Sequence, residues 1–546
     1  MGSATVISRV LQRGLRLGPP STRRLRITRD LRVPMGDGVE LLADRWAPAD
    51  GGEGLPVALL RTPYGRGGVM GPAMARPLAE RGFQVVMQSV RGTFGSGGTF
   101  DPLRRERDDG LATIEWIRSQ PWYGGSIVLT GPSYLGYVQW AVADAAPDVV
   151  AMIPQVTNAD LTLEFVRPDG LSLETPFIWG VMVAGQERRG AMVRQVLEAR
   201  KQRRAIATIP LGRADEAMLG RRDDYLQDIL VHDSGSERWA GIDHTARVPL
   251  VQAPVSSVAG WYDIFLPGQL RDFGTLQALG RNPRLTVGPW THSSPELFSE
   301  SLNETLAFGL AHARGQAPPN REPVRLWMMG EEAWREFPSW PPPGYGPTRF
   351  ALGARGALSA EAPGATGHDG YRYDAADPTP AAGGVRMIVS GLGAKRLTGR
   401  VDNRELEARP DVLVYSTPPL ERDVEVVGNV TAEIWFKSSV PFADVFVRLC
   451  DVDGSGRSTN VCDGLVSLRT ADELSCVRIA LWPTAHRFRS GHRIRVQVSS
   501  GSFPRFARNP GTGESHATAT RLVAADQEVW FGVDHPSAIV LPTAVA

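Results

Sequence analysis

Residues 129–140, LTGPSYLGYVQW, place a serine between a strand-like run and a helix-like run. Residues 126–130 are apolar and β-branched, as in a buried strand, and the residues from Tyr134 onward favour a helix. A sharp turn at this junction would lift the Ser133 side chain out of a sheet and aim the next backbone N–H at a developing oxyanion. Ser133 is therefore either a nucleophile or an ordinary helix cap.

The motif around Ser133 departs from the usual G-x-S-x-G pattern of such nucleophiles. The stretch reads G-P-S-Y-L-G: Gly131 precedes the serine by two positions and Gly136 follows it by three, while Leu135 stands where the second glycine is expected. Taken alone, this motif leaves both interpretations open.

Apolar runs on both sides of this turn predict a mostly parallel sheet. The runs are short and rich in β-branched residues, as in strands buried on both faces. They alternate with helical patterns such as residues 107–120, which predicts a doubly wound α/β domain, and a hairpin over residues 26–48 precedes it. The predicted strands cover residues 56–64, 83–92, 126–131, 149–157, 250–263, 284–292 and 323–330.

Two other regions differ in pattern from this sheet. Residues 160–245 are helical and charged, and they interrupt the series of strands, as an inserted lid would. The segment PSWPPPGYGP, residues 338–347, marks a boundary rich in breaker residues. Beyond it, short strands and Gly, Pro and Asp turns predict an all-β sandwich or jelly roll.

Composition excludes several classes of function. The 546 residues are too many for a single core, and 42% hydrophobic with 22% charged residues is typical of a soluble globular protein. A net charge of +1 without a long basic stripe argues against nucleic acid as a partner. The three cysteines and nine histidines lack the spacings of a disulfide framework or a metal site, so we expect a reducing, cytoplasmic location and no bound metal.

The N-terminal segment predicts a basic amphipathic helix. Apolar residues recur at helical spacing over residues 6–15, arginines occupy the other side, and the first acidic residue is Asp30. A helix of this type can lie on a membrane surface. The segment is too short and interrupted for a spanning helix or a secretory signal, and the prediction favours a short helix packed on the body.

Two further residues are placed as partners of Ser133. Asp263 directly follows the predicted strand that ends in GWYD, and His292 directly follows the one that ends in GPWTH. Sites in open α/β sheets form at the carboxyl ends of strands, and the order Ser, Asp, His matches a catalytic triad. Asp263 would orient the imidazole of His292, which would act as base and then acid.

Several of these stretches together resemble the cocaine esterase and X-Pro dipeptidyl-peptidase (CocE/NonD) family of serine hydrolases. The resemblance runs through nearly the whole chain after residue 25 and also includes PVRLWMMGEEAWREFPSWPPP and GHRIRVQVSSGSFPRFARNPGTG. Its most specific motifs are TPYGRG, RGTFGSGG, GPSYLGYVQW, GWYD and GPWTH.

The resemblance implies a division of the chain into three parts. An α/β-hydrolase domain would comprise residues 1–158 and 247–345, with a helical cap inserted at residues 159–246. A jelly roll would follow at residues 346–546.

The same resemblance implies roles for individual residues. Ser133 would be the nucleophile, Asp263 the orienting carboxylate and His292 the base, with no cofactor required. The Tyr64 hydroxyl and the Tyr134 backbone N–H would form the oxyanion hole. At the acyl pocket, Phe265 matches an apolar position, with core packing as the alternative, and Trp179 of the cap is a further candidate.

Two departures from the family pattern affect these expectations. Ser89 stands where relatives usually carry Asp, so a supporting hydrogen-bond arrangement would differ there. Ile264 and Phe265 follow Asp263, where α-amino-acid ester hydrolases carry acidic residues that capture an ammonium group. This difference disfavours capture of an ammonium group, and a carboxylate of the cap is the alternative source of such a contact.

The expected function is hydrolysis of esters, or amides, of small acyl groups. The partner is thus a small-molecule ester or a short peptide. Two alternatives stay open, an X-Pro dipeptidyl peptidase and a carbohydrate- or ligand-binding protein whose hydrolase site has decayed. The family includes monomers and dimers, so a homodimer is also compatible with the sequence.

Overall fold

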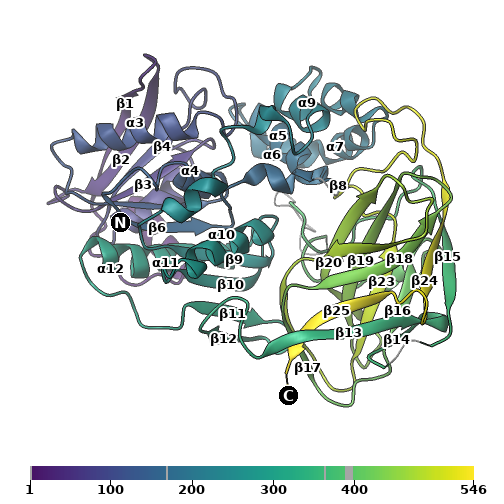
Figure 1. The fold of residues 1–546 in the computed structure, drawn as a ribbon. Coiled ribbons are helices and arrows are strands. Elements are labelled where there is room, and N and C mark those ends of the chain that lie inside the picture. The colour runs from purple at the N-terminus through teal and green to yellow at the C-terminus, as the bar shows by residue number, and fades with distance from the viewer. Residues whose placement is uncertain (1–2, 168–169, 362–363, 388–396, 546) are drawn as a thin grey trace.

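The computed structural model describes residues 3–167, 170–361, 364–387 and 397–545, and its two large sheets flank a group of short helices (Figure 1). The first sheet has ten strands in the order β1-β2-β4-β3-β5-β6-β9-β10-β11-β12. Its strands are β1 (Leu25–Pro34), β2 (Glu40–Pro48), β3 (Val57–Thr62), β4 (Gln84–Ser89), β5 (Ile127–Pro132), β6 (Val149–Gln155), β9 (Ser256–Tyr262), β10 (Arg284–Thr291), β11 (Val324–Met328) and β12 (Ala333–Phe337).

The strands from β4 to β11 in this order are parallel, whereas β1, β2 and β12 pair antiparallel at the two edges. This arrangement confirms the α/β class predicted from the sequence. Strand β12 was not predicted, because its residues are only half-buried and lack a clear apolar alternation.

Helices cover both faces of the ten-stranded sheet. Alternate residues of β3 belong to different cores: Val57 packs with residues of α3 and α10, and Ala58 packs with residues of α2, α11 and α12. Because successive strand residues point to opposite faces, these two cores lie on opposite sides of the sheet. The helices are α2 (Arg76–Ala79), α3 (Glu106–Arg118), α4 (Tyr134–Trp140), α10 (Leu266–Ala278), α11 (Pro295–Glu304) and α12 (Leu310–Ala313).

The chain between β6 and β9 forms the helical cap. Two antiparallel strands of two residues each, β7 (Val166–Arg167) and β8 (Gly170–Leu171), precede the helices. These helices are α5 (Glu174–Gly185), α6 (Ala191–Leu197), α7 (Ala199–Ile206), α8 (Ala214–Leu219) and α9 (Asp224–Val231).

A second, thirteen-stranded sheet builds the C-terminal domain, which also contains the short helix α13 (Arg404–Glu407). The pairs are antiparallel apart from β14 with β16, as expected for an all-β sandwich. The strands are β13 (Tyr345–Gly353), β14 (Ala357–Ser359), β15 (Gly367–Tyr373), β16 (Leu413–Ser416), β17 (Val424–Gly428), β18 (Thr431–Ser438), β19 (Ala443–Val452), β20 (Ser458–Leu468), β21 (Ser475–Ala480), β22 (Thr484–Phe488), β23 (Arg493–Ser499), β24 (Ala525–Phe531) and β25 (Ala538–Ala544).

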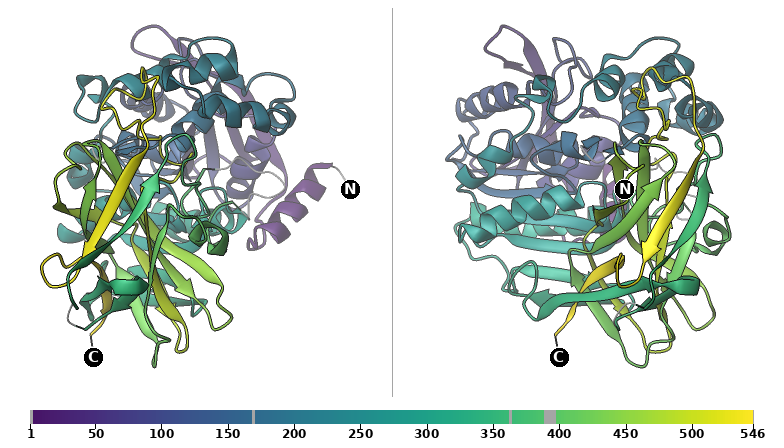
Figure 2. Two further views of the ribbon diagram at one scale, coloured as in Figure 1. Left: turned by 90° about the vertical axis from the view of Figure 1, so that its right-hand side faces the viewer. Right: turned by 45° about the vertical axis from the view of Figure 1, so that its right-hand side comes forward.

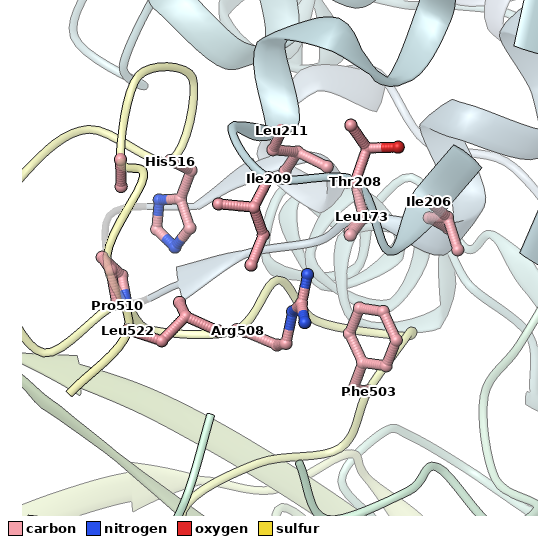
Figure 3. Close-up of a pocket in the computed structure, with 11 residues that line it drawn as sticks. Leu173, Ile206, Thr208, Ile209, Leu211, Phe503, Arg508, Pro510, His516 and Leu522 are labelled. Carbon is pink, nitrogen blue, oxygen red and sulfur yellow. The ribbon is translucent and has the colours of Figure 1, made fainter. Parts of the chain in front are cut away.

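The cap and the C-terminal domain are joined by buried polar contacts. Glu174, at the start of α5, and Arg386 form a buried ion pair with two hydrogen bonds, Nε to Oε2 at 2.7 Å and Nη2 to Oε1 at 2.5 Å. A small cavity between the two parts is lined by apolar side chains together with Arg508 and His516 (Figure 3). Arg508 donates to the Ala207 carbonyl of the cap at 2.8 Å, and burial lowers the pKa of His516 to about 4, so a neutral imidazole occupies this boundary.

The N-terminal helix α1 (Ser3–Gly14) lies at the periphery of the molecule (Figure 2). Its contact with the body is partly polar, because the buried Ser8 hydroxyl donates to Glu80 at 2.8 Å. The apolar side chains of Val6, Ile7 and Val10 point to solvent and are 42–63% exposed. In the described part of the chain, no helix combines the length and the apolar character needed to cross a bilayer.

Asp444, at the start of β19, is a buried carboxylate whose hydrogen-bond donors are neutral. Its Oδ1 accepts hydrogen bonds from the Ser467 hydroxyl at 2.7 Å and from the Asn509 amide at 2.8 Å. Burial raises the pKa of Asp444 to about 6 from its usual 3.8. The protonated carboxyl group therefore makes its full contribution to the stability of the folded chain below pH 3.8. This contribution is lost as the pH rises through 6, and the loss in the free energy of unfolding is about 3 kcal/mol in total.

We expect Asp444→Asn to stabilise the protein at neutral pH, because the amide resembles the protonated acid. The free energy of unfolding should rise by about 2–3 kcal/mol at pH 7.5, with the gain shrinking toward zero near pH 4. Thermal and denaturant unfolding across this pH range measures the effect. The matched control is Asp463→Asn, which removes a buried carboxylate bound by Arg448 and Arg505 and should destabilise the protein at pH 7.5. A gain in the free energy of unfolding that does not depend on pH would contradict the conclusion that burial raises the pKa of Asp444.

Candidate active site

Ser133 lies at the junction of β5 and α4 in a strained backbone conformation, φ 58° and ψ −123°. A non-glycine residue adopts such angles only where the surrounding structure imposes them, and such residues concentrate at functional sites. The Ser133 N–H donates to the Gln155 carbonyl at 2.8 Å, which fixes the turn against β6. Ser133 occupies the N-cap position of α4, but its side chain makes no capping hydrogen bond, so helix capping does not account for a serine here.

The glycines around Ser133 explain the unusual motif. A Cβ at Gly131, where φ is 138°, would lie 2.5 Å from the Leu135 Cβ, and a Cβ at Gly136 would lie 2.3 Å from the Thr157 Cγ2. The close approach between α4 and the end of β6 thus occurs at Gly136, one position later than in the usual motif. Leu135 points instead into the core around α2, where a large side chain is accommodated.

Asp263 and His292 are hydrogen-bonded to each other. They follow the neighbouring strands β9 and β10, and the His292 Nδ1 lies 2.6 Å from the Asp263 Oδ2. The other oxygen, Oδ1, accepts the Phe265 N–H at 2.8 Å, and the carboxylate is completely buried. The Trp482 indole of the C-terminal domain donates to the Asp263 main-chain carbonyl at 3.2 Å. Both oxygens of the carboxylate are therefore engaged, and the imidazole has a defined orientation.

The sheet brings these residues and Tyr64 to one edge. Tyr64, Ser133, Asp263 and His292 each follow a strand within the parallel series β3-β5-β6-β9-β10. The carboxyl ends of parallel strands share an edge, which is where open α/β sheets build sites. Phe265 connects His292 with the pocket at Ser133. Its ring lies edge-on to the His292 ring, with 5.4 Å between ring centroids, and it lines the same pocket as Ser133.

Tyr64 contacts both Ser133 and the cap. Its hydroxyl oxygen accepts the Trp179 indole N–H of α5 at 2.9 Å and also interacts with the Ser133 side chain. Burial raises the pKa of Tyr64 to about 12, so the phenol keeps its proton at neutral pH. Since the oxygen already accepts from Trp179, that proton is available for donation on the Ser133 side.

Tyr134, whose backbone N–H follows Ser133, is held by its own side chain. The Tyr134 hydroxyl donates to the Glu106 Oε1 at 2.6 Å and accepts the Leu103 N–H at 2.9 Å. Its ring stacks on Trp179 at an interplanar angle of 11°. Glu106 is buried with Arg61, at an Nη1 to Oε2 distance of 2.9 Å. Neither Glu106 nor Arg61 is predictable from the sequence, because neither belongs to a catalytic motif.

The pocket above Ser133 is apolar and aromatic. None of its described lining residues carries a charged side chain. Five of them come from the chain between β6 and β9 that forms the cap: Leu161, Phe165, Thr175, Trp179 and Tyr225. Phe265 and Trp179 are among the residues predicted from the sequence, whereas Tyr225 is not, since the order of residues along a helical insertion does not indicate which of them reach the sheet. The lining residues are Tyr64, Leu103, Ser133, Tyr134, Leu161, Phe165, Thr175, Trp179, Tyr225, Ile264, Phe265 and Met387.

Ser89 also takes part in a hydrogen-bond arrangement near this edge. Its hydroxyl accepts the Arg66 Nη1–H at 3.0 Å, and Arg66 also pairs with the carboxylates of Asp30 and Asp44. Two other acids therefore balance the guanidinium charge, and an uncharged residue at position 89 leaves Arg66 paired.

Two family models match the chain. One, described as X-Pro dipeptidyl-peptidase (S15 family), matches residues 37–294, and the other, its C-terminal non-catalytic domain, matches residues 319–540. The chain is 33% identical to the cocaine esterase of Rhodococcus sp. (strain MB1 Bresler) over 577 aligned positions, which cover 94% of this chain and 98% of the relative.

Solved structures share the complete fold. An α-amino acid ester hydrolase superposes with a TM-score of 0.80 at 21% identity, over 96% of this chain and 98% of that one. An aminopeptidase from a marine sediment Thaumarchaeota archaeon superposes with a TM-score of 0.77 at 22% identity, over 95% and 97% of the two chains. These likenesses show the fold, and the sequence matches show that the chain belongs to the cocaine esterase and X-Pro dipeptidyl-peptidase family of serine hydrolases.

Proposed function

We propose that the protein hydrolyses esters of small, uncharged acyl groups with Ser133, His292 and Asp263 as a catalytic triad. The observation that carries the proposal is the hydrogen bond between His292 and the buried Asp263, beside the pocket that the strained Ser133 lines. A serine needs a base to remove its proton, and the base needs a third group to orient it. These three residues supply one group of each kind.

The reaction follows from these positions. Ser133 Oγ attacks the ester carbonyl while the His292 Nε2 accepts its proton, and Asp263 stabilises the resulting imidazolium. The Tyr64 hydroxyl and the Tyr134 N–H donate to the oxyanion of the tetrahedral intermediate. Collapse expels the alcohol, which takes the proton from His292 and leaves an acyl-enzyme. Water, deprotonated by His292, then attacks the acyl carbon, and the acid departs as Ser133 recovers its proton.

The pocket lining favours an ester over a peptide with a free amino terminus. A peptidase of the X-Pro type needs a carboxylate to bind the substrate ammonium group, because a buried cation without a partner is strongly disfavoured. Aromatic and aliphatic side chains surround Ser133 in the described part of the chain, and they suit an uncharged acyl group.

The first test compares p-nitrophenyl butyrate with Gly-Pro-p-nitroanilide. We expect the wild type to release p-nitrophenol from the ester, with at most slow cleavage of the anilide. Ser133→Ala should lower kcat/KM for the ester by at least about 10⁴-fold, since removal of a triad nucleophile leaves only binding and oxyanion stabilisation.

The control for this test is Ser455→Ala, at an exposed turn of the C-terminal domain, which should leave the activity unchanged. Unfolding curves of Ser133→Ala should match those of the wild type. Ester turnover that survives in Ser133→Ala would overturn the proposal, and faster cleavage of the anilide than of the ester would assign the protein to the peptidases.

The oxyanion hole is tested by removing one donor at a time. Tyr64→Phe should lower kcat about 10²–10³-fold with little change in KM, because its hydroxyl binds charge that develops in the transition state. Trp179→Phe should lower kcat about tenfold, since the Tyr64 proton is then no longer directed by the indole.

A double-mutant cycle separates this effect from general damage to the pocket. With Tyr64 already replaced by Phe, the additional change Trp179→Phe should have little further effect on kcat. Trp530→Phe, which removes an indole donor in the C-terminal domain, is the matched control. Additive losses in the cycle would show that Trp179 does not act through Tyr64.

A further inference from the structure

The hydroxyl of Tyr225 is a buried polar group without a hydrogen-bond partner among the described residues. Tyr225 lies in the first turn of the cap helix α9 and lines the pocket that contains Ser133. Buried hydroxyl groups in folded proteins nearly always have a partner, and an unsatisfied one destabilises the fold. An exception at the active-site pocket therefore calls for a functional explanation.

The two other tyrosines of the pocket differ from Tyr225 in this respect. The Tyr64 oxygen accepts the Trp179 N–H, and the Tyr134 hydroxyl lies between the Leu103 N–H and the Glu106 carboxylate. Both of these hydroxyl groups thus have partners in the protein. The Tyr225 hydroxyl remains available for a partner that enters the pocket.

The Tyr225 ring is held in a fixed position near the proposed oxyanion hole. It packs edge-on against Trp179, with 4.9 Å between ring centroids, and Trp179 is hydrogen-bonded to Tyr64. Space beside the ring is tight: a Cβ added at Gly180 of α5 would lie 3.1 Å from the Tyr225 Cδ1. A donor fixed in this way loses little conformational entropy when it binds.

Most of the surrounding lining is apolar, with Leu161, Phe165, Ile264 and Met387 among its members. Besides Ser133 and the tyrosines, Thr175 is the described lining residue that carries a hydroxyl group. In such an environment a single hydrogen-bond donor discriminates strongly, because a ligand without an acceptor leaves the donor unpaired. Burial and the nearby Tyr64 hold the pKa of Tyr225 well above its usual value, so the phenol keeps a proton to donate.

We propose that the Tyr225 hydroxyl selects ester substrates whose acyl group carries an ether, carbonyl or hydroxyl oxygen, to which it donates a hydrogen bond. The inference rests on the proposed ester hydrolysis and adds the chemical class of the acyl group. Plain hydrocarbon acyl groups of the same size fill the same space but leave the hydroxyl unpaired.

The experiment compares p-nitrophenyl esters of matched size, in which an ether oxygen replaces a CH₂ group or a carbonyl oxygen replaces a methyl branch. Suitable pairs are methoxyacetate with butyrate, 3-methoxypropanoate with pentanoate, and 4-oxopentanoate with 4-methylpentanoate. For each pair, the ratio of kcat/KM is measured for the wild type and for Tyr225→Phe. Intrinsic differences in ester reactivity cancel when the two ratios are divided.

We expect Tyr225→Phe to lower kcat/KM for the oxygenated ester of at least one pair about three- to tenfold more than for the matching hydrocarbon ester. This is the effect of one hydrogen bond between uncharged groups. The thermal stability of Tyr225→Phe should equal or exceed that of the wild type, because no internal hydrogen bond is lost. Tyr371→Phe removes a buried hydroxyl that is bonded to Ser500 in the C-terminal domain, and it should lower stability without changing the ratios.

Ratios in Tyr225→Phe that stay within 1.5-fold of the wild-type ratios for all three pairs would overturn the inference. A larger decrease of kcat/KM for the hydrocarbon esters than for the oxygenated esters in Tyr225→Phe would overturn it as well. Failure of the proposed function has a different signature, since ester turnover would then persist in Ser133→Ala. The two outcomes are therefore distinguishable in a single set of assays.

Discussion

The strained turn at Ser133 is the constraint on which the arrangement of the site depends. At this turn, α4 approaches the end of β6 so closely that a Cβ at Gly136 would overlap Thr157, and a Cβ at Gly131 would overlap Leu135 of α4. The hydrogen bond from the Ser133 N–H to the Gln155 carbonyl ties the turn to the neighbouring strand. Ser133 is thereby positioned relative to the sheet that also carries Asp263 and His292, so the separation of the three residues is determined by strand order.

Each of the three parts of the chain supports one element of the candidate site. The sheet provides Tyr64, Ser133, Asp263 and His292. The cap contributes Trp179, whose indole directs the Tyr64 hydroxyl, and the C-terminal domain contributes the Trp482 indole, which binds the Asp263 carbonyl. Preorganisation of this kind matters for catalysis because donors that are already oriented need no rearrangement as charge develops.

Much of the fold was predictable from the sequence, and the reasons are physical. Buried parallel strands read as apolar runs, so β3, β5, β9 and β10 and the residues that follow them could be found. The edge strand β12 could not, because its half-buried residues lack that pattern. Glu106, Arg61 and Tyr225 were also missed, since their importance arises from contacts between segments distant in sequence. Leu135 departs visibly from the usual motif, but only the packing shows that Gly136 provides the close approach.

The Trp482 contact has a consequence for any attempt to divide or recombine this protein. The indole reaches across from the C-terminal domain to the main chain of Asp263, whose side chain orients His292. A fragment that ends after the first sheet would contain every residue of the proposed triad and still lack this support. Chimeras with a foreign β-domain therefore need an indole, or another donor of similar reach, at the equivalent position. The domain described as non-catalytic thus contributes a hydrogen bond that supports the proposed active site.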